Sequence, residues 1–138
     1  MPDTSVHVLQ AAAIPVKAGA VCVVTARSGQ RWVIPKGMID PGHTAAETAL
    51  REAWEEAGLA GILLPKPVGT YLYEKWDRTH HVTVFLMRVT DAAEDWPEHS
   101  FRQRCWLKPA EVLARIDDPG LREVIRAALK QHAEALRG

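Results

Sequence analysis

The segment GMIDPGHTAAETALREAWEEAGL, residues 37–59, decides how this 138-residue chain folds. Thr44 is a good N-cap residue, and Glu47 three positions later completes a capping box. Gly58 is well placed to end a helix in the left-handed conformation. The segment therefore predicts a helix over residues 45–57 that follows a loop over residues 35–43.

The chain on both sides of this helix carries patterns typical of strands. Apolar runs rich in β-branched and aromatic residues predict strands over residues 6–16, 20–26, 31–34, 68–76, 79–90 and 103–107. Proline-containing starts predict two further helices over residues 109–116 and 121–136. This order of elements predicts a single α/β (α+β) domain over residues 1–138, with helices packed against a mixed β-sheet.

Composition and charge exclude several classes of protein. Lys and Arg number 17 and so do Asp and Glu, which argues against a general nucleic-acid binder. No apolar run approaches the roughly 20 residues of a membrane span, and the N-terminus lacks the features of a signal peptide. We therefore expect a cytoplasmic protein, monomer or homodimer, without nucleic-acid or membrane partners.

Three carboxylates are predicted to share one face of the helix. At 100° per residue, Glu52, Glu55 and Glu56 fall within about 100° of one another. The predicted buried stripe on the other side consists of Ala46, Leu50, Ala53, Trp54 and Ala57. A solvated acidic surface is also compatible with this pattern, because like charges at i,i+4 cost only about 0.2–0.5 kcal/mol per pair. Arg51 could relieve the repulsion by pairing with Glu55.

The loop before the helix favours a metal site over a plain acidic surface. Gly37 and Gly42 bracket this loop, and a glycine-rich loop readily offers backbone carbonyls. Clustered carboxylates beside a carbonyl suit Mg²⁺ or Mn²⁺, which prefer oxygen ligands and often take further ligands from substrate phosphates. The residues therefore indicate metal-assisted hydrolysis of a phosphoanhydride.

The same segment resembles the Nudix box, Gly-x5-Glu-x7-Arg-Glu-U-x-Glu-Glu-x-Gly-U, where U is apolar. The matching residues are Gly37, Arg51, Glu52, Glu55, Glu56 and Gly58. At average residue usage, these matches have a chance frequency of about 10⁻⁷ per start position. The resemblance extends over about residues 20–115. It implies a Nudix-type α/β/α sandwich and hydrolysis of a diphosphate linked to a further group.

The resemblance also implies roles for individual residues. It assigns Mg²⁺ (or Mn²⁺) to the carboxylates of Glu52, Glu55 and Glu56 and the carbonyl of Gly37. Glu52 or Glu56 would orient or deprotonate the attacking water. Arg51 would orient an acid, although a purely structural ion pair is equally compatible. A further acid outside the box often completes such a site, and Glu98 or Glu94 is the candidate.

One position departs from the box pattern. His43 stands where the family has its first glutamate, which lies near the metal site and helps to hold the box together. Three readings stay open for His43: a loop residue without chemistry, a weak metal ligand or proton relay, and a mark of a binding-only site. Asp40 and Glu47 are nearby acids that could partly compensate.

Basic residues at predicted strand ends and in loops are the candidates for substrate binding. They are Arg27, Lys36, Arg78, Arg102 and Arg104, with Lys75 at a further strand end. Residues 94–96 and 101–107 also resemble diphosphoinositol polyphosphate phosphohydrolases. The expected substrate is a diphosphoinositol polyphosphate or a diadenosine polyphosphate. The alternatives are another nucleoside diphosphate derivative (ADP-ribose, a nucleotide sugar or a nucleoside triphosphate) and a non-catalytic nucleotide sensor.

Aromatic residues and histidines give further expectations. Trp32, Trp54 and Trp106 are expected to pack in the interior, whereas Trp76, at a strand end, is the candidate for stacking on a nucleobase. Residues 80 and 81 are both histidine, and strand alternation sends their side chains to opposite faces.

Overall fold

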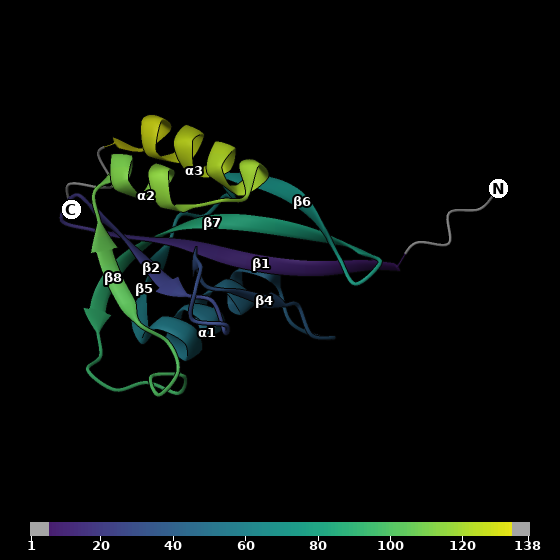
Figure 1. Ribbon diagram of the computed structural model, residues 1–138, viewed down its shortest axis with the longest axis horizontal. Helices are drawn as coiled ribbons and strands as arrows, with labels where there is room; N and C mark the ends of the chain where they lie inside the picture. Colours follow the sequence, from purple (N-terminus) through teal and green to yellow (C-terminus); the bar gives the residue numbers. More distant parts are fainter. Residues whose placement is uncertain (1–5, 134–138) are drawn as a thin grey trace.

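A mixed sheet with helices on both faces forms the computed structural model, which describes residues 6–133 (Figure 1). The elements are β1 (Val6–Lys17), β2 (Ala20–Thr25), β3 (Trp32–Val33), β4 (Lys36–Met38), α1 (Ala45–Ala57), β5 (Leu59–Leu63), β6 (Gly69–Lys75), β7 (Arg78–Ala92), β8 (Arg104–Leu107), α2 (Pro109–Arg115) and α3 (Pro119–Gln131). This architecture confirms the predicted α/β sandwich. Within the described range, no helix is long and apolar enough to cross a membrane.

The two long strands β1 and β7 lie parallel at the centre of the sheet, paired from Val6↔Arg78 to Val16↔Arg88. All other strand pairs are antiparallel: β2 and β4 on β1, β5 and β6 on β7, and β3 and β8 on β2. Figure 1 shows α1 on one face of the sheet and α2 and α3 on the other. Successive β1 side chains therefore alternate between two cores.

The two cores differ in the size of their residues. On the α1 face, alanines of β1 (Ala11 and Ala13) meet alanines of α1 (Ala49, Ala53 and Ala57). The opposite core contains larger side chains, among them Ile14, Leu86, Val112, Ile116 and Ile125. Small side chains on both partners allow α1 to lie close to β1. As a result, α1 also lies against β4, the short strand in the box loop that pairs with β1.

The predicted orientation of α1 is wrong for two residues. Trp54 is 43% exposed and Leu50 is 37% exposed, while Glu56 is only 6% exposed. The helix turns its alanine side toward the sheet because β1 offers alanines there and leaves no room for an indole. Since Glu56 lies only about 40° from Glu52 and next to this alanine side, the acidic and buried faces overlap.

Two short strands were not predicted. β4 lies within the expected loop and pairs with β1 through Gln10↔Met38, and β5 follows α1 directly and pairs with β7. Runs of three and five residues are too short for a clear alternation. The C-terminal helix starts at Pro119, after the Asp118 cap, and ends at Gln131. The rest of its predicted length beyond residue 133 lies outside the described residues.

Candidate functional site

Glu56, in the last turn of α1, is the most deeply buried acid of the box. The backbone N–H of Lys36 donates to its Oε1 at 3.4 Å. Burial, together with a hydrogen bond shared with the Glu52 carboxyl group, raises the pKa of Glu56 to about 9, and the Arg102 guanidinium opposes this shift. Glu52 and Glu56 therefore form a close carboxyl pair that retains a proton at neutral pH.

Gly37 provides the space in which the Glu52 carboxyl group lies. A Cβ atom on Gly37 would be 2.4 Å from the carboxyl carbon and Oε1 of Glu52. β4 holds Gly37 in register opposite Ala11 of β1, at the point where α1 packs on β1. The backbone of the box loop thus lies directly against one of the box carboxylates.

Arg51 fastens the box loop to the helix. Its Nη1 donates to Asp40 Oδ2 at 3.1 Å, and its Nη2 donates to the Met38 carbonyl at 3.2 Å and to Glu52 Oε1 at 3.4 Å. Arg51 therefore orients Glu52 and pairs with Asp40, not with Glu55, the partner that the i,i+4 spacing suggests. Asp40 supplies the loop anchor in a chain that lacks the first box glutamate.

His43 lies at the surface of the loop, one residue before the N-cap. Its backbone N–H donates to the Asp40 carbonyl at 3.1 Å, and its side chain is exposed. The capping box predicted from Thr44 and Glu47 is confirmed, with Thr44 N–H donating to Glu47 Oε1 at 2.9 Å and Glu47 N–H donating to Thr44 Oγ1 at 3.1 Å. The Glu47 side chain thus caps the N-terminus of α1.

The loop between β7 and β8 brings an acid and a cation to Glu56. Arg102 donates from Nε to Glu98 Oε1 at 2.7 Å and from Nη1 to the Thr25 carbonyl at 2.8 Å, and its Nη2 lies 3.8 Å from Glu56 Oε1. Glu98 therefore joins the acidic cluster. Glu94, the other candidate acid, is exposed and lines an open depression beside Trp96.

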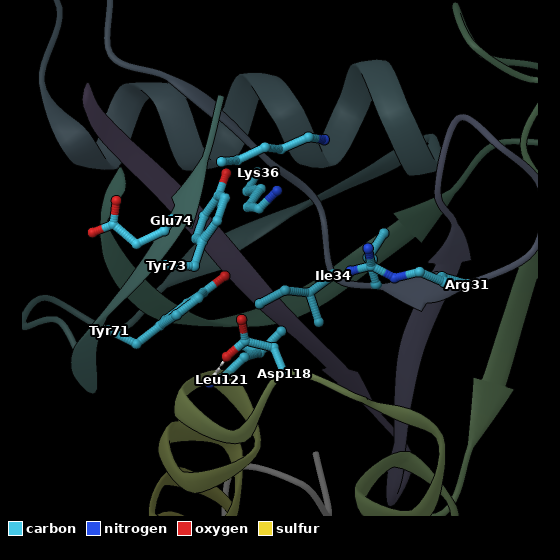
Figure 2. Close-up of a pocket in the computed structure, with 10 residues that line it drawn as sticks. Arg31, Ile34, Lys36, Tyr71, Tyr73, Glu74, Asp118 and Leu121 are labelled. Carbon is cyan, nitrogen blue, oxygen red and sulfur yellow. Dashed lines mark hydrogen bonds between the residues drawn. The ribbon is translucent and has the colours of Figure 1, made fainter. Parts of the chain in front are cut away.

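A pocket of about 370 Å³ lies on the sheet face that carries α3, and Lys36, whose backbone N–H donates to Glu56, is one of its lining residues (Figure 2). It is lined by Arg31, Val33, Ile34, Lys36, Tyr71, Tyr73, Glu74, Lys75, Asp118 and Leu121. The Lys36 ammonium lies 5.1 Å from the centre of the Tyr73 ring, and burial lowers the pKa of Lys36, with Glu56 opposing. The side chain of Lys36 thus lines the pocket, while its backbone N–H donates to the Glu56 carboxyl group.

Two neighbouring side chains fix the position of Tyr73 in the pocket. Tyr73 donates its hydroxyl to Gln10 Oε1 at 2.7 Å, and its ring stacks on the buried His80 at 4.5 Å. His81 points to the other face, where its Nε2 lies 2.7 Å from His7 Nδ1. The alternation predicted for the two histidines is confirmed.

The other basic candidates lie elsewhere. The exposed Arg27 lies over the Phe101 ring at 5.0 Å. Arg78 is exposed and is the first residue of β7, in the turn that joins β6 to β7. Arg104 donates to the Ala57 carbonyl at 2.8 Å. Of the five candidates, Lys36 lines the pocket, and Arg102 contacts the acids.

Sequence reasoning missed Arg31, Tyr71 and Tyr73. The two tyrosines are two positions apart in a predicted strand, a spacing that places both side chains on one face. That signal was available. Their convergence with Lys36 depends on the pairing of β4 with β1, and short β4 had not been predicted.

The NUDIX domain family model matches residues 7–128. The chain belongs to the Nudix family. Nudix hydrolase 12, mitochondrial, of Arabidopsis thaliana is 36% identical over 101 residues, covering 67% of this chain and 50% of that protein. Diphosphoinositol polyphosphate phosphohydrolase 2 of Homo sapiens is 32% identical over 93 residues, covering 66% and 50%. The chain spans about half the length of these curated relatives.

Solved structures show the same fold. An Ap4A hydrolase of C. elegans in a binary complex superposes with a TM-score of 0.79 at 21% identity, covering 92% of this chain and 98% of that chain. A Nudix hydrolase from Nitrosomonas europaea gives a TM-score of 0.71 at 20% identity, covering 93% and 90%. At these identities, the likeness concerns the fold.

The Nudix box of this chain has a donor set that fits a divalent cation. Within residues 6–133, no three acidic, histidine or cysteine side chains converge on one metal-sized point. Glu52 and Glu56 do meet beside Gly37, and Mg²⁺ typically uses one or two carboxylates together with waters and substrate phosphates. Glu55 is partly exposed next to this pair. The Nudix pair thus meets the usual demand of Mg²⁺ without a third acid.

Because Glu56 of the Nudix box is protonated in the fold, the stability of the protein should depend on pH. The pKa of Glu56 in the fold, about 9, lies above its ordinary value of 4.5, so the folded protein holds a proton that the unfolded chain loses in between. Stability of the metal-free protein should therefore fall as pH rises from about 5 to 9, and Glu56→Gln should flatten this dependence. Thermal unfolding across this range in a chelating buffer measures it. A melting temperature that rises with pH in the wild type, or an equal slope in both proteins, would contradict the assignment.

Proposed function

We propose that this protein hydrolyses a phosphoanhydride bond in a phosphate-rich substrate, with Mg²⁺ or Mn²⁺ as cofactor. The observation that carries the proposal is the Glu52–Glu56 pair against Gly37, with Glu56 buried and bonded to the backbone of Lys36, a half-buried lysine that lines the pocket. Membership of the Nudix family supports it. So do the names of the relatives, which include diphosphoinositol polyphosphate phosphohydrolases.

Each residue of the box has a proposed role in metal binding or hydrolysis. Glu52, Glu55, Glu56 and the Gly37 carbonyl are the proposed metal ligands, and the ion supplies polarisation of phosphoryl oxygens and activation of water. One carboxylate of the Glu52–Glu56 pair accepts the proton of the attacking water. Arg51 keeps Glu52 in place through its 3.4 Å contact. Arg102 balances the negative charge between Glu56 and Glu98.

The pocket favours a nucleotide among the phosphate-rich candidates. The rings of Tyr71 and Tyr73 are stacked with centroids 6.2 Å apart; Tyr71 is buried, and the partly exposed Tyr73 offers aromatic surface to a base or sugar. Lys36, Arg31 and Lys75 supply positive charge to a phosphate chain. The Asp118 carboxylate would repel a densely phosphorylated inositol ring, whereas it can accept a hydrogen bond from a nucleoside. These features support a diadenosine polyphosphate type of substrate.

A substrate panel tests this proposal. Diadenosine polyphosphates, diphosphoinositol polyphosphates, ADP-ribose and nucleoside triphosphates are incubated with Mg²⁺ or Mn²⁺, and products are followed by ³¹P NMR. We expect the fastest turnover with a diadenosine polyphosphate. A faster reaction of the inositol substrate would contradict the nucleotide preference, and no product from any compound would contradict the enzymatic proposal.

His43→Glu separates an enzyme from a non-catalytic sensor. If the missing box glutamate has weakened the site, the substitution should raise the rate strongly. Because Asp40 already anchors Arg51 at 3.1 Å, we expect little gain. Nucleotide binding without turnover, combined with a large gain in His43→Glu, would instead identify a sensor with a weakened site.

The predicted cytoplasmic location and oligomeric state stay predictions.

Lys36→Met should weaken substrate use without harming the fold. The methionine can still pack near Tyr73 but cannot contact phosphate, and a hydrogen bond to a charged group contributes about 1.5–3 kcal/mol, so kcat/KM should fall roughly 10- to 100-fold. Removing a half-buried ammonium should leave the melting temperature equal or higher. Lys66→Met, at an exposed lysine lining a different depression with Pro65 and His132, is the matched control and should keep wild-type kinetics. Unchanged kcat/KM in Lys36→Met would exclude a phosphate contact.

A further inference from the structure

Residues 93–104, which connect β7 to β8 and include the first residue of β8, donate hydrogen bonds to four successive carbonyls at the C-terminal end of α1. The last carbonyls of a helix have no partners within it. Here successive carbonyls find donors in residues 93–104. Glu98 N–H donates to Glu55 O at 3.0 Å, Trp96 Nε1 to Glu56 O at 3.0 Å, Arg104 Nη1 to Ala57 O at 2.8 Å and Ala93 N–H to Gly58 O at 2.9 Å.

Two of the four donors are side chains, and these two pack on each other. The Arg104 guanidinium lies 4.4 Å from the centre of the Trp96 ring. Trp96 is 8% exposed and covers the helix end so closely that a Cβ on Gly58 would lie 2.9 Å from its ring. The positive charge of Arg104 also suits the negative end of the helix dipole. We refer to Trp96 and Arg104 as the helix-end clamp.

The helix-end clamp holds the residues that carry the box acids. The carbonyls bound by this segment belong to Glu55 and Glu56 as well as to Ala57 and Gly58, so the clamp fixes the last turn of α1. The same segment carries Arg102, which reaches the Glu56 carboxylate at 3.8 Å. A shift of the helix end therefore moves the Glu56 backbone relative to Gly37 and Lys36, which belong to β4.

We propose that Trp96 and Arg104 are positioning residues that set the Glu56 carboxylate against the box loop, and that metal affinity and turnover depend on them. The inference rests on the proposed function. In this proposal Arg104, a predicted substrate-binding residue, acts through the helix end.

Trp96→Phe and Arg104→Met test the clamp. The first keeps an aromatic ring over Gly58 and removes the donor to Glu56 O; the second keeps a long side chain and removes the donor to Ala57 O. Groups that orient metal ligands typically contribute about 10- to 100-fold to metal affinity or activity. We expect kcat and Mn²⁺ affinity, the latter measured by electron paramagnetic resonance, to fall in that range in each variant, with KM within about twofold of wild type.

Arg122→Met is the matched control. Arg122 donates to the Ile116 carbonyl at 2.7 Å, at the C-cap of α2 on the opposite face of the sheet. The Arg122→Met substitution removes the same kind of side-chain hydrogen bond from a helix end that carries no box acid. We expect its melting temperature to fall while kcat and Mn²⁺ affinity stay at wild-type values, all assays being run well below each melting temperature.

The outcomes separate the two proposals. Wild-type kcat and Mn²⁺ affinity in both clamp variants, with only a lower melting temperature, would overturn the positioning role. A raised KM with unchanged kcat in Arg104→Met would overturn it in favour of a substrate contact. If the wild type turns over no panel substrate, the proposed function fails, and Mn²⁺ affinity alone then decides on the clamp: loss in Trp96→Phe but not in Arg122→Met supports it, and equal affinities contradict it.

Discussion

Glu56→Gln should reduce hydrolysis by about 10³-fold. An amide can neither balance the charge of a divalent cation nor accept the proton of an attacking water, and such metal chemistry supplies several kcal/mol at about 1.4 kcal/mol per factor of ten. Glutamine has the same shape and can still accept the Lys36 N–H now bonded to Oε1 at 3.4 Å. The metal-free variant should therefore fold normally. Steady-state rates and thermal unfolding measure both effects.

Glu123→Gln is the control for this substitution. Glu123 is exposed on α3 and pairs with Arg126, on the sheet face opposite α1. Its variant should hydrolyse substrate at the wild-type rate. Full activity of Glu56→Gln, or an equal loss in Glu123→Gln, would contradict the assigned role of Glu56.

Gly37→Ala should impair the site with little effect on stability. The new methyl group would lie 2.4 Å from the Glu52 carboxyl group, which is the end of a flexible side chain and can rotate away. Folding should tolerate this movement, but Glu52 would leave its place beside Glu56. Because displacing a reacting group by about 1 Å can cost about 10²-fold, we expect a loss of that size in kcat.

A double-mutant cycle isolates the contact between Gly37 and Glu52. In a Glu52→Gln background, already impaired, the alanine should add little, because both substitutions act through the same carboxylate. Additive losses would show that Gly37→Ala acts through the backbone of the loop rather than through Glu52. Kinetics and melting temperatures of the four proteins provide the measurement.

Local chemistry made α1 predictable. Thr44, Glu47 and Gly58 define its ends through contacts within a few residues, and the structure has the helix at the predicted bounds. The box acids were identifiable for a similar reason, since their spacing along one helix needs no tertiary information. The burial of Glu56 was not predictable in this way, because it depends on which side of the helix the alanines of β1 accept.

The surroundings of the acids depend on distant parts of the chain. Tyr73 and Lys36 meet only because β6 pairs with β7, β7 with β1, and β1 with β4. Sequence shows that Arg102 and Arg104 are charged and near a strand, but it does not show their partners. In the fold, these arginines bind Glu98 and the Ala57 carbonyl, so their predicted contact with substrate remains a prediction without structural support.

The dependence of hydrolysis on free Mg²⁺ decides whether the box carboxylates act through a bound cation. Purified wild-type protein is stripped with a chelator and titrated with Mg²⁺ in the presence of diadenosine polyphosphate, and product is quantified by ³¹P NMR. We expect no turnover in the metal-free protein and a saturable rise in rate with Mg²⁺ that is about 10³-fold smaller in Glu56→Gln. Turnover that persists at full rate without a divalent cation, or no turnover at any Mg²⁺ concentration, would contradict it.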